Sequence, residues 1–286
     1  MTILEVIQRS ADFLAKKGVP SPRLQVEHLL AHVLQMPRMK LYLSFERALS
    51  QEQLDAVRAL VQRRGRREPL QQITGSAAFC GLELAVNPQV LAPRPETELL
   101  AERAWKFLQQ SSALHSAPAA LDLGTGSGCL AIALAVKVPS AAIHATDASA
   151  EALALARENA ARHHAGIQFH HGDLFAALPP AARFRLIVSN PPYIPTARLD
   201  TLEPEVRDHE PRQALDGGAD GMDFYRRIAA EAGAFLEADG RLMLELDEDG
   251  PEKAAEIFRQ QNWIVEGIES DYNQRPRILI ARLPTV

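Results

Sequence analysis

The sequence predicts an α/β protein: a seven-stranded, mostly parallel sheet that follows a small all-helical N-terminal domain and a β-hairpin linker. Three observations predict this organisation. Residues 1–72 carry helical hydrophobic spacing, residues 73–95 carry short alternating strands, and residues 96–286 alternate strand-like and helix-like segments. The 286 residues are enough for two domains, because one domain usually has roughly 100 to 200 residues.

The first 72 residues are expected to form several helices with short connections. Their apolar side chains recur three and four positions apart, which places them on one face of a helix. Pro20, Pro22 and Pro37 separate these runs, because proline lacks the N–H group that a helix interior needs.

The chain from residue 73 changes its hydrophobic period twice. Residues 73–95 predict a hairpin around the turn residues Gly81 and Asn87-Pro88, and "ETELLAERAWKFLQ" then predicts a helix with acids in its first turn. Strands are expected at 119–123, 141–146, 167–170, 184–189, 240–246, 263–269 and 277–283, and helices at 127–137, 149–163, 221–237 and 250–261. Repeated strand and helix predict a parallel sheet that is covered on both faces. Such sheets bind ligands at the carboxyl ends of their strands, near the topological switch point.

The composition is that of an ordinary globular protein, with 47% hydrophobic and 23% charged residues. The 31 lysines and arginines against 36 acids give a formal charge of -5, which provides no overall positive field for a polyphosphate chain. The charge therefore argues against direct binding of nucleic acid.

Cysteine content and hydropathy favour the cytoplasm. Cys80 and Cys129 lie in unrelated contexts, which supports neither a disulfide framework nor a metal site of the CxxC type. The start "MTILEVIQRSADFLAKKG" has no continuous apolar stretch, and nowhere do 18 apolar residues follow one another. We expect a cytoplasmic protein without membrane contact.

A glycine-rich turn in "ALDLGTGSGCLAIALA" predicts a nucleotide-like cofactor. Gly124, Gly126 and Gly128 stand where a strand turns into a helix, and glycine there permits positive φ and close approach of a ligand to free backbone N–H groups. Asp147 ends the next strand, about 20 residues on, where a carboxylate can accept hydrogen bonds from both ribose hydroxyls.

Two questions about this turn stay open at the level of sequence. Residues 126–131 also satisfy the G-x-G-x-x-A pattern of dinucleotide-binding proteins, and a tight turn that binds nothing would have the same glycines. Asp122 could hold the amino group of a cationic amino-acid moiety, or it could accept hydrogen bonds from local N–H groups at a strand end.

The motif Asn190-Pro191-Pro192-Tyr193 follows the fourth predicted strand. The two proline peptide units lack N–H groups, so the carbonyls of Asn190 and Pro191 belong to a backbone that only accepts hydrogen bonds. The Asn190 side chain adds a carbonyl and Tyr193 adds a flat ring, and together they suit a planar NH2 group. The alternative is that these common turn residues merely end a strand.

Methyl transfer to an amide nitrogen needs such a site. The nitrogen is a poor nucleophile because its lone pair is delocalised into the carbonyl, and acceptors placed for a pyramidal nitrogen would favour the transition state over the planar ground state. The expected electrophile is a sulfonium methyl group. A metal is not needed, and a dedicated base is optional.

With "LDLGTGSG" and "NPPY" in place, the chain resembles the class I S-adenosylmethionine-dependent methyltransferases, and specifically the HemK-type release factor glutamine methyltransferases. The resemblance extends through "EPLQQITGSAAFCGLELAVNPQVLAPRPETELL" and "HEPRQALDGGADGMDFYRRI". It implies a seven-stranded Rossmann-like methyltransferase fold on residues 96–286, joined by the hairpin linker 73–95 to a substrate-docking domain on residues 1–72. It also implies methylation of the side-chain amide nitrogen, N5, of the glutamine in the Gly-Gly-Gln motif of class I peptide chain release factors.

The resemblance also implies roles for individual residues. The turn residues Gly124, Thr125, Gly126, Ser127 and Gly128 would hold the methionine part of S-adenosylmethionine. Asp147 would hold the ribose, Asp173 and Leu174 would border the adenine, and Asn190 would lie beside the cofactor. Asn190, Pro191, Pro192 and Tyr193 would hold the glutamine amide.

Three other features carry polar or charged side chains. His163, His164, His170 and His171 show no fixed ligand geometry and are interpreted as solvated or capping residues rather than a metal site. The basic run at residues 63–69 is either a solvated helix end or a contact for an acidic partner surface. Arg94 is either part of a helix-start signal or a neighbour of the active cleft.

Competing functions remain. An exocyclic-amine (adenine N6) DNA methyltransferase would also hold an NH2 group, although the chain has no evident basic target-recognition domain. A nicotinamide oxidoreductase would use the glycine turn but leave NPPY unexplained. A non-catalytic cofactor-binding module is the fourth possibility.

Overall fold

The computed structural model describes residues 1–112 and 117–284. They divide into two compact units, which are described separately. The first unit comprises Met1–Ser76 together with Glu203–His209, and the second comprises Ala77–Leu202 and the chain from Glu210 onward. The first unit is thus assembled from two stretches that lie far apart in the sequence.

Helices form the first unit. They are α1 (Ile3–Lys16), α2 (Pro22–Leu34), α3 (Arg38–Tyr42), α4 (Gln51–Gly65), α5 (Leu70–Thr74) and the short α9 (Pro204–Arg207). Thr2 and Ser50 start α1 and α4 with capping boxes, which satisfy N–H groups that have no partner inside a helix. The apolar faces of α1 to α5 meet in one core around Ile3, Leu29 and Leu30. The predicted helical N-terminal region is confirmed.

Ion pairs hold α9 to α4 inside this unit. Arg64, only 3% exposed, and Arg67 both bind Glu205, at 2.7 and 2.6 Å, and Arg67 also binds Glu203 at 2.8 Å. Part of the basic run at 63–69 therefore meets an acidic surface that belongs to this same chain.

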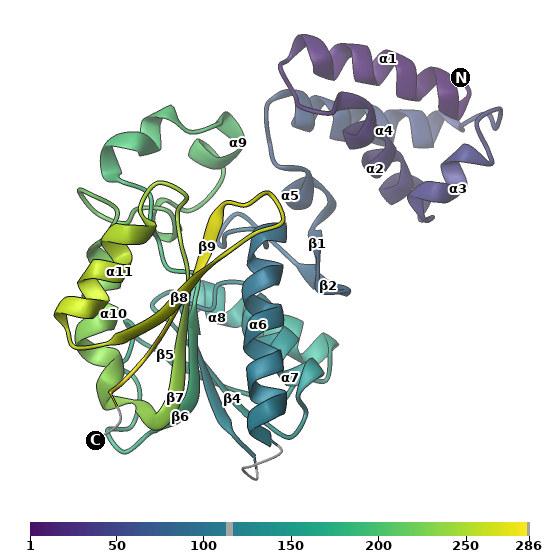
Figure 1. The fold of residues 1–286 in the computed structure, drawn as a ribbon. Coiled ribbons are helices and arrows are strands. Elements are labelled where there is room, and N and C mark those ends of the chain that lie inside the picture. The colour runs from purple at the N-terminus through teal and green to yellow at the C-terminus, as the bar shows by residue number, and fades with distance from the viewer. Residues whose placement is uncertain (113–116, 285–286) are drawn as a thin grey trace. The chain divides into compact units, whose positions relative to one another are not determined.

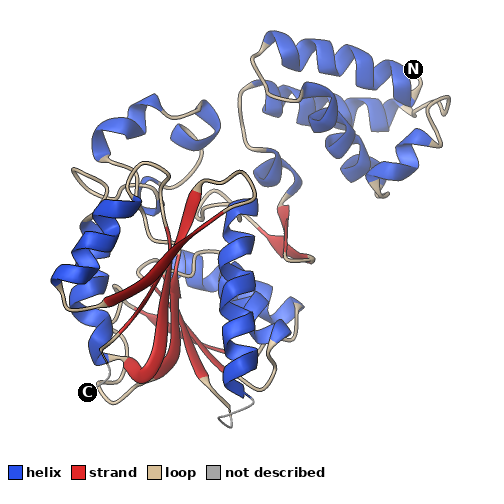
Figure 2. Ribbon diagram, in the orientation of Figure 1, coloured by secondary structure: helices blue, strands red, loops and turns tan. Residues whose placement is uncertain are grey.

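The second unit is built on one seven-stranded sheet (Figure 2). Its strands are β3 (Ala119–Leu123), β4 (Ala142–Asp147), β5 (Ile167–His171), β6 (Phe184–Ser189), β7 (Leu236–Glu245), β8 (Ile264–Ser270) and β9 (Pro276–Arg282). The spatial order is β5-β4-β3-β6-β7-β9-β8, and of these seven strands β9 alone runs antiparallel to the other six. The order reverses between β3 and β6, so the switch point lies between the glycine turn and the NPPY motif. The predicted fold class is confirmed.

Helices cover both faces of this sheet (Figure 1). One face carries α6 (Pro95–Ser112), α7 (Cys129–Lys137) and α8 (Ala150–Arg162), and the other carries α10 (Asp223–Glu231) and α11 (Pro251–Gln260). Neighbouring strand residues point to opposite faces: Ala120 packs with α6 and α7, and Leu121 packs with α10 and α11. A separate two-stranded sheet is formed by β1 (Ser76–Phe79) and β2 (Leu82–Ala85), which is the predicted hairpin.

One local prediction was wrong, and one group of short helices was not predicted. The helix expected over 221–237 ends at Glu231, a 3-10 turn η3 (Ala232–Ala234) follows, and β7 already begins at Leu236. Leu236 pairs with Phe184, so strand pairing prevails over the helical pattern of the sequence. No element was predicted between residues 196 and 214, where α9 lies with the 3-10 helices η1 (Thr196–Thr201) and η2 (Arg212–Ala214).

Within the described part of the chain, no helix is both long enough and apolar enough to span a lipid bilayer.

Candidate active site

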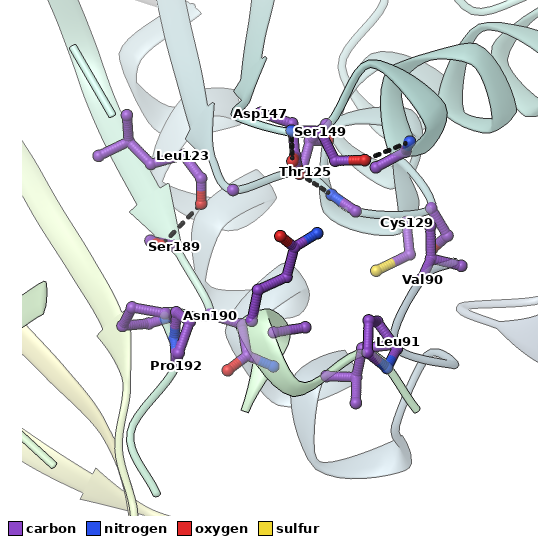
Figure 3. A pocket seen from close by; sticks show the side chains of 18 of the residues that line it. Val90, Leu91, Leu123, Thr125, Cys129, Asp147, Ser149, Ser189, Asn190 and Pro192 are labelled. Atoms are coloured by element: carbon purple, nitrogen blue, oxygen red, sulfur yellow. Dashed lines mark hydrogen bonds between the residues drawn. The ribbon is translucent and has the colours of Figure 1, made fainter. Parts of the chain in front are cut away.

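A cavity of about 230 Å³ opens at the carboxyl ends of β3, β4 and β6, as expected for a parallel sheet. Ten of the predicted site residues line it: Gly124, Thr125, Gly126, Ser127, Asp147, Asp173, Leu174, Asn190, Pro191 and Pro192. Asp122, Gly128 and Tyr193 do not line the described cavity. In Figure 3, Asp147, Thr125 and Ser149 gather at one end of the cavity, and Asn190 and Pro192 lie away from them.

The three glycines of the turn have positive φ but different surroundings. A Cβ added at Gly124 or at Gly126 would meet no atom within 4 Å, so both face open space in the cavity. A Cβ added at Gly128 would lie 3.0 Å from Ile132 and 3.1 Å from Ala156. Gly128 therefore serves the close packing of α7 on α8, and the first two glycines leave room for a ligand.

Asp147 closes the turn from the end of β4. Its carboxylate accepts hydrogen bonds from the backbone N–H of Gly126 at 2.8 Å and of Ser149 at 2.9 Å. These bonds fix the carboxylate at the cavity wall, where its remaining lone pairs can accept from hydroxyl groups.

Asp122 lies behind the turn, on the side of the sheet that carries α7. Its Oδ2 accepts from the Thr125 hydroxyl at 2.7 Å and from the Ala131 N–H at 3.1 Å, which is the local role considered as the alternative. Its buried Oδ1 has no hydrogen-bond partner among the described residues. Burial raises the pKa of Asp122 to about 7, and the two hydrogen bonds oppose that rise.

Asn190 stands at the end of β6, next to β3. The Ser189 hydroxyl donates to the Leu123 carbonyl at 2.7 Å, which ties the two strand ends together (Figure 3). Asn190, Pro191 and Pro192 follow and line the cavity opposite the glycine turn. The structure thus brings together the two motifs that the sequence analysis singled out.

The ring of Tyr193 packs against the core that α10 and α11 form with the sheet. Burial raises the pKa of the Tyr193 hydroxyl, with a further contribution from the charge of Glu245. Tyr193 therefore anchors the motif in the protein, and its predicted role on the substrate amide stays a prediction.

Thr97 and Glu245 support Asn190 from behind, and neither was predicted as a site residue from the sequence. The Asn190 side-chain N–H donates to the Thr97 hydroxyl oxygen at 3.2 Å, and the Thr97 hydroxyl donates to Glu245 at 2.7 Å. Both supporting side chains are 2% exposed. Burial raises the pKa of Glu245 to about 7, against the lowering effects of the Thr97 hydrogen bond and the charge of Arg277.

A glycine-rich loop holds the backbone after Pro192. The Ile194 N–H donates to the Leu215 carbonyl at 3.0 Å, and the Gly217 N–H donates back to the Ile194 carbonyl at 2.9 Å. A Cβ at Gly217 would lie 2.8 Å from the Tyr193 Cα, and one at Gly221 only 2.4 Å from the Tyr193 carbonyl oxygen. The glycines of "DGGADGMD" are a signal in the sequence for this close approach, which was not among the predictions.

Arg94 and Asp173 complete the wall with ion pairs. Arg94 lines the cavity and binds both carboxylate oxygens of the buried Glu210, at 2.7 and 2.6 Å. Asp173 accepts from Arg227 at 2.7 Å. The interpretation of Arg94 as a neighbour of the cleft is confirmed.

His163, His164, His170 and His171, all in the described part of the chain, form no shared ligand set. His163 and His171 bond to backbone carbonyls, and His170 meets His144 at 3.0 Å between ring nitrogens. In residues 1–112 and 117–284, no three His, Cys, Asp or Glu side chains converge as a metal site would require.

Comparison with known proteins identifies the family. A family model described as the PrmC N-terminal domain matches residues 5–75, and one described as the methyltransferase small domain matches residues 102–202. A solved methyltransferase from Pyrococcus furiosus shares the fold, with a TM-score of 0.53 at 21% identity over 77% of this chain and 97% of that chain.

Two curated relatives match almost from end to end. The release factor glutamine methyltransferase of Geobacter sulfurreducens is 45% identical over 282 residues, 99% of this chain and 97% of that protein. That of Chlorobaculum tepidum is 42% identical over 283 residues, 96% of this chain and 95% of that protein. This chain is therefore a methyltransferase and belongs to the release factor glutamine methyltransferase family.

Proposed function

We propose that the chain transfers a methyl group from S-adenosylmethionine to the side-chain amide nitrogen, N5, of the glutamine in the Gly-Gly-Gln motif of class I release factors. The observation that carries the proposal is that Asn190, Pro191 and Pro192 line the same cavity as the glycine turn. The names of the full-length relatives support glutamine in a release factor as the acceptor.

The residues of the turn fit S-adenosylmethionine. Gly124 and Gly126 leave open space at positive φ, and Asp147 is fixed at the wall of the same cavity. We assign the methionine part to residues 124–127, the ribose to Asp147, and the adenine to Asp173 and Leu174; Gly128 packs α7 on α8 instead. When bound, S-adenosylmethionine supplies an electrophilic methyl group on a positively charged sulfur.

The protein contributes position and hydrogen-bond acceptors. The Asn190 side-chain carbonyl and the Pro191 backbone carbonyl are assigned the two hydrogens of the glutamine NH2 group. Held in this way, the nitrogen is drawn toward the pyramidal geometry that it has during transfer, which lowers the barrier. No side chain is required as a base, because the nitrogen becomes strongly acidic only after methylation and then releases its proton to solvent water.

The helical N-terminal domain, residues 1–72, is proposed to dock the release factor, and residues 73–95 are proposed as the linker to the methyltransferase domain, residues 96–286. Recognition of a folded protein substrate needs contacts beyond one glutamine side chain, and a cavity of about 230 Å³ does not provide them. Direct contact with nucleic acid or membrane has no part in the proposal.

A labelled-transfer experiment tests the proposed function. The protein is incubated with S-adenosylmethionine carrying a labelled methyl group and, separately, with a class I release factor or an adenine-containing DNA duplex. We expect label on the release factor, located by mass spectrometry on the Gly-Gly-Gln glutamine. Label on the duplex alone would refute the proposed substrate and favour the DNA methyltransferase.

A further inference from the structure

Three elements of the second unit meet behind Asn190. Thr97 lies in the first turn of α6, Asn190 follows β6, and Glu245 ends β7. Their side chains form one chain of hydrogen bonds, from Asn190 Nδ2 to Thr97 Oγ1 at 3.2 Å and from Thr97 Oγ1 to Glu245 Oε2 at 2.7 Å. We call these three residues the amide relay.

The donors and acceptors of the relay fix its direction. When Glu245 is ionised, above its pKa of about 7, its carboxylate only accepts hydrogen bonds, so the single hydroxyl proton of Thr97 is committed to Glu245. The Thr97 oxygen can then only accept, and the group of Asn190 that can donate to it is the NH2 group. The side-chain carbonyl of Asn190 is thereby turned away from Thr97.

Burial makes this direction costly to reverse. Thr97 and Glu245 are each 2% exposed, so water has little access to offer either group a substitute partner. Reversing the Asn190 amide would place its carbonyl against the Thr97 oxygen, two acceptors without a proton between them. An unmade hydrogen bond in such a place is costly because no water replaces the lost partner, and this cost keeps the amide in one orientation.

We propose that Thr97 and Glu245 are positioning residues, which set the Asn190 side chain so that its carbonyl oxygen, rather than its NH2 group, is offered to the substrate amide. The inference rests on the proposed function and assigns these two residues a part in it. Neither residue is required to touch the substrate: Thr97 acts through Asn190, and Glu245 acts through Thr97.

A simpler interpretation is that the Thr97–Glu245 bond only fastens α6 to β7. Both interpretations predict that removing the Thr97 hydroxyl lowers stability. They differ in whether removing that hydroxyl lowers the methyl-transfer rate only when Asn190 is present. A double-mutant cycle measures this dependence.

The cycle compares single-turnover methyl transfer to a release factor in four proteins: wild type, Thr97→Val, Asn190→Ala and the double variant. We expect Thr97→Val to lower the transfer rate about 10- to 100-fold in the wild-type background and to have almost no effect once Asn190 is alanine. Cofactor affinity is expected to stay close to that of the wild type in all four. Thr97→Ser, which keeps the hydroxyl, is expected to restore most of the rate, and Thr201→Val on the exposed η1 is the matched control.

The outcomes distinguish a failure of the amide relay from a failure of the proposed function. Equal loss of rate from Thr97→Val in both backgrounds would overturn the amide relay, and so would a normal rate in the single variant. If Thr97→Val does not fold, Glu245→Gln replaces it in the cycle, because a glutamine NH2 group lets Thr97 donate to Asn190 instead. If the wild-type protein transfers no methyl group to the release factor, the proposed function itself has failed.

Discussion

Asp122 and Glu245 are buried carboxyl groups with raised pKa values in the second unit. Asp122 lies at the end of β3 and Glu245 at the end of β7, 1% and 2% exposed. Burial disfavours the charged form of each and raises each pKa to about 7, from ordinary values of 3.8 and 4.5. Each therefore binds its proton more tightly in the folded chain than in the unfolded chain.

The sign of the resulting pH dependence follows from linkage. Because the folded-state pKa of Glu245 is raised, its contribution to stability is complete below about pH 4.5 and is lost as the pH rises toward about 7. We expect the free energy of unfolding of Glu245→Gln, relative to wild type, to rise across this window by up to about 1.4 kcal/mol per pH unit.

Chemical denaturation at several pH values measures this difference. Taking the difference between variant and wild type cancels the contributions of other groups, such as His144 and His170, whose pKa values are lowered by burial. A difference that does not change with pH would show that the Glu245 pKa is not raised.

Among the elements, the loop from Leu215 to Gly221 determines where the NPPY motif lies. It pairs with Ile194 and brings Gly221, at φ +78°, so close to Tyr193 that a Cβ would lie 2.4 Å from a backbone oxygen. Backbone atoms cannot move aside as the end of a flexible side chain can. A larger residue at position 221 therefore has to displace the strand end that carries Asn190.

We predict that Gly221→Ala destabilises the protein by about 1 to 3 kcal/mol and lowers methyl transfer, while cofactor affinity is retained because the glycine turn is untouched. The matched control is Gly267→Ala in β8, where an added Cβ meets no atom within 4 Å. Urea unfolding and transfer rates provide the comparison. A Gly221→Ala protein with wild-type stability and rate would show that the loop does not constrain the motif.

For the molecule as a whole, the hydrophobic period of the sequence predicted the secondary-structure elements that depend on nearby residues. Alternation and helical spacing located all seven strands of the main sheet within a few residues, and the two motifs marked neighbouring strand ends. The same reasoning could not find contacts that only the folded chain creates. Thr97 and Glu245 are 148 residues apart, and Arg64 and Glu205 are 141 residues apart.

The short helices between residues 196 and 214 were missed for the same reason. Helices of this length have little intrinsic stability, and tertiary contacts hold them in place. For α9 these contacts are the ion pairs of Glu205 with Arg64 and Arg67. Nothing in the local sequence shows that Glu203–His209 belongs to the same compact unit as the N-terminal helices.

The most direct test of the account is the Asn190→Ala variant, because the proposed chemistry depends on the acceptor that this side chain provides. We predict that single-turnover methyl transfer to the release factor falls by at least about 100-fold, while calorimetry shows almost unchanged affinity for S-adenosylmethionine. The control is Asn273→Ala, at an exposed turn between β8 and β9, which is expected to behave as wild type. Near-normal transfer by Asn190→Ala would contradict the account.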